Sequence, residues 1–240
     1  MTPTAVTPIR SLRDYIATYK SMAPLPKTHH ELYRGQGDNW PLLPSLFRRP
    51  NTVGLVRKTE RAILQRFIEM IPARAPSRPT NDWDWLSFGQ HFQLPTRLLD
   101  WSKDPLVALF FAVEKNPTAP IVYVYCAQKD QIVKRLDKAD SPFQITVTRI
   151  MKPSPHSIRA TLQGAWHTVH RIHRQKGREV FIPLTDMAFH DGRTNIIRID
   201  PAFVAKIRGE LARLGGITHA TVYGEFESLC TAIRHEFGMK

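Results

Sequence analysis

Cysteine is scarce in this sequence, and the two that occur cannot build a framework. Cys126 and Cys230 lie far apart, without the paired spacing of a zinc site or the number needed for a disulfide scaffold. Long apolar runs are also missing, because the most apolar stretch, residues 105–113, is too short to cross a bilayer. The first ten residues lack the apolar segment of a secretory signal. These absences predict reduced, structural thiols and a cytoplasmic location.

Acidic residues are few relative to basic ones. The chain has 34 Lys and Arg against 21 Asp and Glu, which gives a net charge of +13. Between positions 144 and 178 there are seven basic residues, four histidines and no acidic residue. A concentrated positive field attracts polyanions by neutralising phosphates. We therefore expect a nucleic-acid surface made by Arg149, Lys152, Arg159, Arg171, Arg174, Lys176 and Arg178.

Histidine spacing within this segment does not predict a metal site. His167, His170 and His173 recur every three residues, but positions i and i+6 of a helix diverge widely. No carboxylate or cysteine lies nearby to complete a coordination shell. We expect a solvated or cationic surface here and no bound metal. The lack of a two-metal carboxylate cluster also makes a nuclease the least favoured enzyme class.

The remaining composition suits one folded domain, since 42% of residues are hydrophobic and 23% charged. Helical and strand patterns are interspersed, and no flexible linker separates them. The sequence predicts an α+β fold: a single compact domain over residues 1–240 with a helical lead-in over residues 1–28, and mixed or antiparallel sheets flanked by helices. Expected helices cover 11–22, 58–71, 83–91, 104–114, 201–214 and 228–237; expected strands cover 31–34, 121–126, 144–150, 179–182, 195–199 and 218–223.

Several polar residues precede or follow these elements and are candidates for chemistry. Arg34 lies where a strand meets a glycine-containing turn, which suits either phosphate binding or a structural ion pair. Arg97 and Asp100 could form an internal brace or belong to a ligand site, because buried polar groups need partners. Ser102 could cap the following helix or orient a catalytic group. His91 could act as a general base or be structural.

Two carboxylates near the C-terminus form the other candidate pair. Glu225 and Glu227 stand two apart, after the expected strand 218–223, so extended backbone would place them on one face. They could bind a ribose hydroxyl and stabilise positive charge in an oxocarbenium-like transition state. Equally, they could interact with the positive end of the helix expected over 228–237.

The first half of the chain carries a series of short motifs. They are Tyr33-Arg34-Gly35-Gln36, Trp40-Pro41-Leu42, Pro44-Ser45-Leu46, Gln90-His91, Leu94-Pro95-Thr96-Arg97-Leu98-Leu99-Asp100-Trp101-Ser102 and the apolar residues 105–112. In this order the motifs resemble those of the FRG domain. Weaker similarity extends through Arg159, Gln163-Gly164, Trp166 and residues 216–218, so that it covers most of residues 12–233. This resemblance does not by itself settle an activity.

The order of Arg34, Ser102 and Glu225-Phe226-Glu227 further resembles the Arg-Ser-Glu class of ADP-ribosyltransferases. That resemblance implies a split sheet around an NAD cleft, with Glu227 catalytic, Glu225 acting on the acceptor and Ser102 positioning the site. It implies NAD contacts from Tyr33, Arg34, Gly35, Gln36, His91 and Thr96, braced by Arg97 and Asp100. Two departures are the lone serine at Ser102 and the position of the glutamates ahead of a helix.

Two functions are therefore expected from different classes. The first is an NAD-dependent ADP-ribosyltransferase or NAD glycohydrolase, of the toxin or antiphage-effector kind, with a nucleic-acid or ribonucleoprotein target recruited by the basic segment. The second is a non-catalytic nucleic-acid-binding module, in which Arg34, Arg97 and Asp100 are structural and Trp166 stacks on a base.

Overall fold

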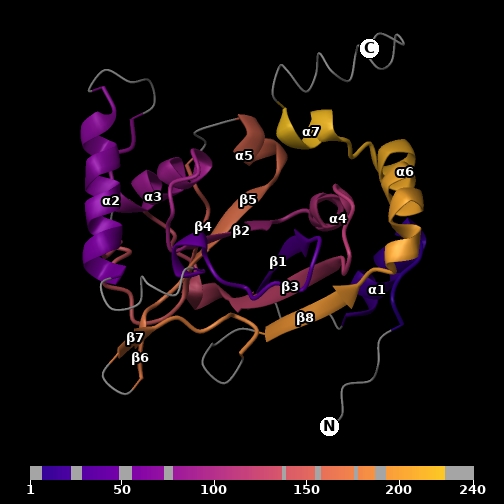
Figure 1. The fold of residues 1–240 in the computed structure, drawn as a ribbon, viewed down its shortest axis with the longest axis horizontal. Coiled ribbons are helices and arrows are strands. Elements are labelled where there is room, and N and C mark those ends of the chain that lie inside the picture. Colours follow the sequence, from indigo (N-terminus) through magenta and orange to yellow (C-terminus); the bar gives the residue numbers. More distant parts are fainter. Residues whose placement is uncertain are drawn as a thin grey trace.

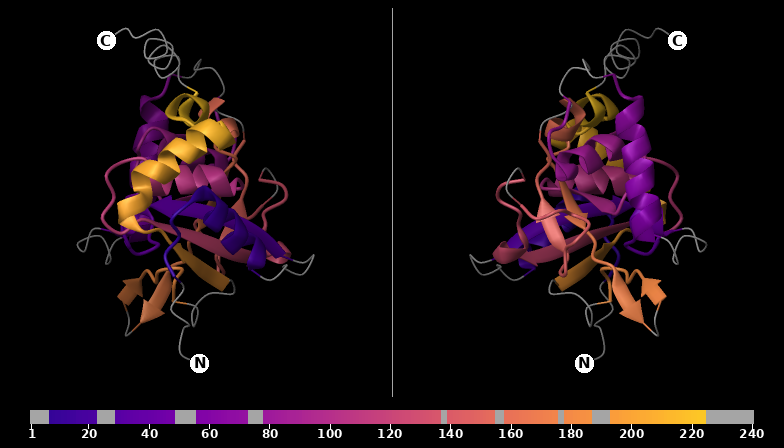
Figure 2. Two further views of the ribbon diagram at one scale, coloured as in Figure 1. Left: turned by 90° about the vertical axis from the view of Figure 1, so that its right-hand side faces the viewer. Right: turned by 90° about the vertical axis from the view of Figure 1, so that its left-hand side faces the viewer.

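A six-stranded antiparallel sheet forms the centre of the protein (Figure 1). The computed structural model describes residues 7–22, 29–48, 56–72, 78–136, 139–154, 158–175, 178–186 and 193–224. The strand order is β4-β5-β2-β1-β3-β8. The strands are β1 (His29–Gln36), β2 (Leu98–Ser102), β3 (Ile121–Gln128), β4 (Arg149–Met151), β5 (Ala165–Val169) and β8 (Arg193–Arg198). A separate hairpin pairs β6 (His173–Gln175) with β7 (Arg178–Val180), and Figure 2 shows it projecting on the side away from the helices.

Helices surround this sheet, which confirms the expected α+β class. Ser11 Oγ accepts a hydrogen bond from Asp14 N at the start of the first helix, and Asp104 caps the apolar helix that begins at Pro105. The helices are α1 (Leu12–Ser21), α2 (Val56–Met70), α3 (Asp82–His91), α4 (Pro105–Val113), α5 (Ile158–Leu162), α6 (Val204–Gly215) and α7 (His219–Tyr223). Among the described residues, none of these helices combines the length and apolarity needed to span a membrane.

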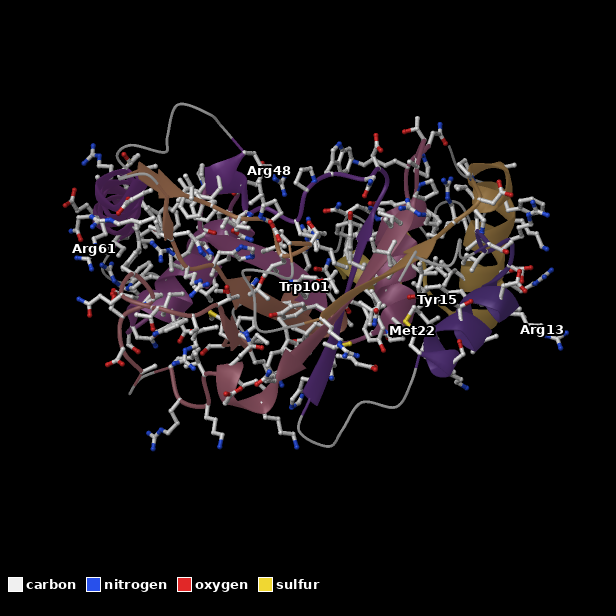
Figure 3. The ribbon with its side chains drawn as sticks, turned by 90° about the horizontal axis from the view of Figure 1, so that it is seen from below. Arg13, Tyr15, Met22, Arg48, Arg61 and Trp101 are labelled. Carbon is white, nitrogen blue, oxygen red and sulfur yellow. The ribbon has the colours of Figure 1, made fainter. Side chains whose placement is uncertain are left out.

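Both faces of β3 are buried, which explains why this strand is apolar at nearly every position. On one face Val122, Val124 and Cys126 pack with residues of α1, α4 and α6. On the other face Tyr123 and Tyr125 pack with a second apolar cluster that includes residues of β1, β2 and the loops. In Figure 3, Trp101 of this second cluster lies near the middle of the molecule, whereas Arg13 and Arg61 lie toward its two ends. A strand buried on both sides carries a continuous apolar run.

One expected strand is a helix instead. Residues 218–223, which include three β-branched side chains, were expected to be extended, but α7 occupies His219–Tyr223. Thr218 and Thr221 form a reciprocal capping box, and Gly224 ends the helix with a φ of 59°. These local hydrogen bonds satisfy the helix termini and outweigh the strand propensity of threonine and valine. The expected strand 144–150 is also shorter, since only Arg149–Met151 pairs.

The sheet is weakly joined between β1 and β2. These strands form a single residue pair, Tyr33 with Ser102, whereas β1 and β3 pair over eight positions. Beyond that pair the strands diverge. The Asp100 carbonyl oxygen accepts from the side chain of Arg34, through Nη1 at 2.8 Å, where regular strand pairing would supply a backbone amide. The six strands of the main sheet thus form one continuous sheet that opens locally between β1 and β2, rather than the split sheet implied by the ADP-ribosyltransferase resemblance.

Close contact between β1 and α4 sets a strict requirement at Gly35. A Cβ atom at this position would lie 1.8 Å from the carbonyl oxygen of Ala108 and 2.6 Å from the amide nitrogen of Ala112. Both are backbone atoms, so neither can move without shifting α4. Position 35 therefore requires glycine because no side chain fits between β1 and α4.

We predict that Gly35→Ala lowers the free energy of unfolding by at least about 2 kcal/mol, because overpacking against backbone cannot relax. Gly209→Ala in α6 is the matched control, since a Cβ atom there would have no neighbour within 4 Å and a helical alanine should stabilise by about 1 kcal/mol. Urea unfolding of both variants measures the effect. Equal stability of Gly35→Ala and the parent protein would contradict the packing account.

Candidate active site

A cleft of about 710 Å³ opens where β1 and β2 diverge. Its walls come from the ends of α3 and α4, from α5 and from the turn after β1. Charged and polar side chains lie at its base, and Trp40 forms part of its rim with 58% of its surface exposed. A concave site of this size, with a few convergent polar groups, suits a nucleotide-sized ligand.

Asp100 supplies the carboxylate of the cleft. Its side chain lines the cleft and is 61% exposed. Gln90 Nε2 donates to Asp100 Oδ1 at 2.9 Å, and His167 Nδ1 lies 3.1 Å from the same oxygen. Desolvation at the cleft floor would raise the pKa of Asp100, but His167, Arg34 and Gln90 together hold that pKa well below the ordinary range of an aspartate. The carboxylate is therefore ionised at neutral pH.

Arg34 supplies the cation beside it. Arg34 Nε donates to Gln36 Oε1 at 3.1 Å, and Nη1 donates to the Asp100 carbonyl oxygen at 2.8 Å. Gln36 is itself anchored, because its Nε2 donates to the Trp40 carbonyl oxygen at 2.9 Å. Burial lowers the pKa of Arg34, and the nearby Asp100 carboxylate opposes this change. Nη2 makes no hydrogen bond with the described residues, and Arg34 lines the cleft, so one nitrogen of a fixed guanidinium is available to a ligand there.

His167 lies behind Asp100 and connects it to α3. The two residues are direct partners in the pairing of β2 with β5. On the other side of the ring, His167 Nε2 lies 3.1 Å from Ser87 Oγ. Both His167 and Ser87 are only 6% exposed. The expectation that His167 forms part of a solvated surface was wrong, because the β2–β5 register turns its ring inward.

Arg34, Gln90 and Asp100 all lie in the part of the chain that matches a known protein family. Residues 29–119 match the FRG domain. The matched FRG segment runs from β1 to the turn after α4 and so carries the Arg34–Asp100 pair, while His167 lies beyond it. No curated protein and no solved structure matches the chain significantly.

Most of the residues that were expected to bind NAD line this cleft. Tyr33, Gly35, Gln36 and His91 line it together with Arg34. Tyr33 uses its hydroxyl to donate to Glu31, and Gln36 orients Arg34. Thr96 is fully buried, does not line the cleft and donates to Gln90 Oε1. Thr96 thus acts one layer behind, by orienting the amide that donates to Asp100.

Ser102 also lines the cleft, but its hydroxyl is already engaged. Ser102 Oγ donates to the Gln163 carbonyl oxygen at 2.7 Å and accepts from Asp104 N at 2.9 Å. Asp104, not Ser102, caps α4. Ser102 therefore ties the start of α4 to the residues after α5. Glu225 and Glu227, the expected catalytic pair, lie outside the described residues, as does the expected helix 228–237.

Arg97 is a structural brace, but its partner is not Asp100, as was expected. Arg97 pairs with Glu60 of α2, with Nε at 2.9 and 2.8 Å from the two carboxylate oxygens. Both side chains are 1% exposed, and Arg97 Nη1 also donates to the Pro142 carbonyl oxygen at 2.9 Å. Residues three apart along extended backbone point to opposite sides, which directs Arg97 away from Asp100 and into the core. Arg97 braces the cleft from behind, and Asp100 lies in it.

The basic segment is divided among several surfaces. Arg159 of α5 lines the cleft, with its guanidinium 4.6 Å from the ring centroid of Tyr223. Arg174 is exposed on the β6–β7 hairpin, which lies on the opposite side of the sheet from α5 in Figures 1 and 2. The other described members are the exposed Lys152 and the half-buried Arg149 and Arg171, whose Nη1 atoms donate to carbonyl oxygens of Asp130 and Thr146. Lys176 and the side chain of Arg178 lie outside the described residues.

The described residues offer neither a metal site nor a reactive thiol. Within the part of the chain that the structure describes, no three His, Cys, Asp or Glu side chains gather as a metal site would require. Cys126 is a buried free thiol in β3, and burial raises its pKa to about 11. A protonated buried thiol is inert, so Cys126 contributes packing rather than chemistry. Cys230 lies outside the described residues.

Sequence reasoning missed Ser87 and Glu60, and it misjudged His167. Glu60 lies in a helix with an ordinary alternation of charges, so nothing local distinguishes it from exposed Glu69. Ser87 and His167 come together only through the pairing of β2 with β5 and the packing of α3 above it. Trp40 does carry a local signal, because a tryptophan followed by proline, six residues after Arg34, is a candidate ligand contact.

We predict that Glu60→Gln lowers the free energy of unfolding by about 3–5 kcal/mol, because it leaves Arg97 buried without a counter-charge. Glu69→Gln is the matched control in the same helix: its ion pair with Arg66 spans 3.6 Å between exposed side chains, and the loss should stay within about 0.5 kcal/mol. Chemical denaturation of the two variants provides the comparison. Similar small losses for both would show that the buried pair does not anchor β2.

Proposed function

We propose that the chain is an NAD-consuming enzyme, an ADP-ribosyltransferase or NAD glycohydrolase, whose reaction takes place in the cleft beside Asp100. The observation that carries this proposal is the placement of an ionised carboxylate and a fixed guanidinium edge on adjacent strands facing one nucleotide-sized cleft. The match to the FRG domain gives no activity of its own, so the proposal rests on the chemistry of these side chains.

The anionic part of NAD is assigned to Arg34. Its Nε and Nη1 are already held by Gln36 and by the Asp100 carbonyl, which fixes the plane of the guanidinium before a ligand arrives. The remaining Nη2 edge can donate to a pyrophosphate oxygen, and such charge-assisted bonds are about twice as strong as neutral ones. Preorganisation of this kind reduces the entropy lost on binding.

The ribosyl part is assigned to Asp100. Cleavage of the nicotinamide–ribose bond develops positive charge on the ribose, and a nearby carboxylate stabilises that charge. Asp100 suits this role because it stays ionised at neutral pH and opens into the cleft. A depressed pKa makes it a poor general acid, so its contribution is electrostatic or through a hydrogen bond to a ribose hydroxyl. This role replaces, within the described residues, the one expected for Glu227.

Trp40 offers a surface for a planar ring at the mouth of the cleft. Trp40 is 58% exposed although its backbone is held by hydrogen bonds with Asp38 and Gln36. An exposed aromatic ring on a fixed turn stacks on a base or on nicotinamide, and each such stack contributes about 1–3 kcal/mol. The Trp40 side chain therefore supports a ligand with an aromatic group at one end.

A second proposal, nucleic-acid binding, is supported by a different observation. The chain has a net charge of +13, and Lys152 and Arg174 of the basic segment are exposed. Nucleic-acid binding through these residues would use phosphate contacts and weaken steeply with salt. It would not need Arg34 or Asp100, so the two proposals are separable.

We predict that purified protein releases nicotinamide from labelled NAD, and that Asp100→Asn lowers this rate by about 10²–10³-fold through the loss of transition-state charge stabilisation. Asp186→Asn, which changes an exposed aspartate outside the cleft, is the matched control and should leave the rate unchanged. Absence of nicotinamide release from the parent protein, with or without cellular protein and nucleic acid, would sink the proposal. A loss in Glu227→Ala but not in Asp100→Asn would transfer the catalytic role to the C-terminal pair.

We expect Arg34→Ala to raise the KM for NAD about tenfold or more, since it removes the charged contact to pyrophosphate. Binding of a short RNA, measured by fluorescence anisotropy at several salt concentrations, should be unaffected by the same change. Arg213→Ala, an exposed position in α6, controls for lost charge. Parallel loss of NAD turnover and RNA binding in Arg34→Ala would show that the two ligands share the cleft.

A further inference from the structure

We propose that Ser87 and His167 are positioning residues that hold the Asp100 carboxylate in place through a three-member chain running from α3 through β5 to β2. The inference rests on the proposed function in one respect, namely that Asp100 acts on a ligand in the cleft. It adds two residues, neither of which was among the candidates drawn from the sequence.

The chain is built from cross-strand pairing and helix packing. His167 is the register partner of Asp100, so the two side chains extend from the same face of adjacent strands. Nδ1 of His167 lies 3.1 Å from Asp100 Oδ1, and Nε2 lies 3.1 Å from Ser87 Oγ. Three secondary-structure elements are thus connected by one imidazole ring, which fixes the position of the carboxylate relative to the helix wall of the cleft.

The exposure of the three side chains shows which of them faces the ligand. His167 and Ser87 are each 6% exposed, whereas Asp100 exposes 61% of its side chain. In a serine-nucleophile triad the aspartate is the buried end and the serine faces the substrate. Here the order is reversed: the serine is buried and holds the orientation of the histidine ring, and the carboxylate is the group presented to the ligand.

The ring nitrogens have no competing partners. Nδ1 of His167 is buried and forms no hydrogen bond with the described residues, and Asp100 Oδ1 lies 3.1 Å from it, at ion-pair distance. The ionised Asp100 carboxylate can only accept, so a neutral ring beside it keeps its proton on Nδ1, and Nε2 is then the atom that accepts from the Ser87 hydroxyl. The partner of one histidine nitrogen commonly sets the function of the other in this way.

Other charges around the carboxylate do not replace this contact. Arg34 of β1 reaches the backbone carbonyl of Asp100 rather than its side chain, and Gln90 of α3 is neutral. The remaining charged or titratable side chains that line the cleft are Tyr33, Asp38, His91, Glu114, Lys115 and Arg159. Of the groups that lower the pKa of Asp100 against desolvation, His167 comes first.

Two substitutions at one position separate positioning from general structural support. In His167→Asn the side-chain amide occupies the region of Nδ1 and can still donate to Asp100. In His167→Gln the amide extends toward the region of Nε2 and Ser87 instead. Ser87→Ala removes the far end of the chain without altering the ring. Thermal unfolding identifies any variant that does not fold, in which case Ser87→Ala alone decides.

The primary readout is the carboxyl carbon resonance of Asp100, assigned by comparison with Asp100→Asn and followed over pH by NMR. We expect the pKa of Asp100 to stay low in His167→Asn, to rise toward the ordinary aspartate value in His167→Gln, and to rise partly in Ser87→Ala. NAD turnover should follow the same order, with kcat falling roughly tenfold or more in His167→Gln while KM changes little.

An Asp100 pKa that is the same in the parent protein, His167→Asn and His167→Gln overturns the inference. The NMR titration needs no turnover, so failure of NAD cleavage in the parent protein would reject the proposed function and leave this inference to be decided by the titration. If the pKa of Asp100 rises in His167→Gln as expected but kcat does not change, Ser87 and His167 have a structural role and no role in turnover.

Discussion

The buried ion pair between Arg97 and Glu60 is the contact on which the cleft depends. Arg97 lies at the entry to β2 and is tied to α2 through Glu60, to the Pro142 carbonyl and, through its own carbonyl, to His170 N at 3.3 Å. Every residue of β2 is positioned relative to that anchor. Asp100 follows three residues later and Ser102 ends the strand, so the anchor sets where the carboxylate enters the cleft. A buried pair is costly to form and more costly to break, which suits a fixed reference point.

The opposite wall is set by close packing rather than by charge. Gly35 lets α4 approach β1 so closely that no side chain fits between them, and Arg34 is the adjacent residue on the strand. The strand carrying the cation is therefore pressed against a helix on one side and separated from β2 on the other. The local opening between β1 and β2 gives the Arg34 guanidinium its path to the Asp100 carbonyl. Packing and electrostatics together produce one cation and one anion facing a shared space.

Much of the fold follows from local sequence because local physics determines it. The caps at Ser11 and Asp104 and the continuous apolar run of β3 are readable signals, and the corresponding elements are present. The strands β2 and β5 escaped detection, since the polar residues Asp100 and His167 interrupt their apolar pattern where they face the cleft. The helix α7 was mistaken for a strand because the capping box of Thr218 and Thr221 outweighs β-branched propensity.

The candidate site was only half readable for a related reason. Arg34 and Asp100 stand out in the sequence, but their partners are distant along the chain and depend on strand register. Glu60 lies 37 positions from Arg97, and Ser87 lies 80 positions from His167. No local pattern encodes such pairs. The brace was therefore assigned to the wrong residues, and the group behind Asp100 was placed on the surface.

A crystal structure of the protein with a non-hydrolysable NAD analogue tests the central claim most directly. We expect the pyrophosphate within hydrogen-bonding distance of Arg34 Nη2, the nicotinamide ribose beside the Asp100 carboxylate, and a planar ring against Trp40. An empty cleft at saturating analogue, or an analogue bound elsewhere on the protein, would contradict the account.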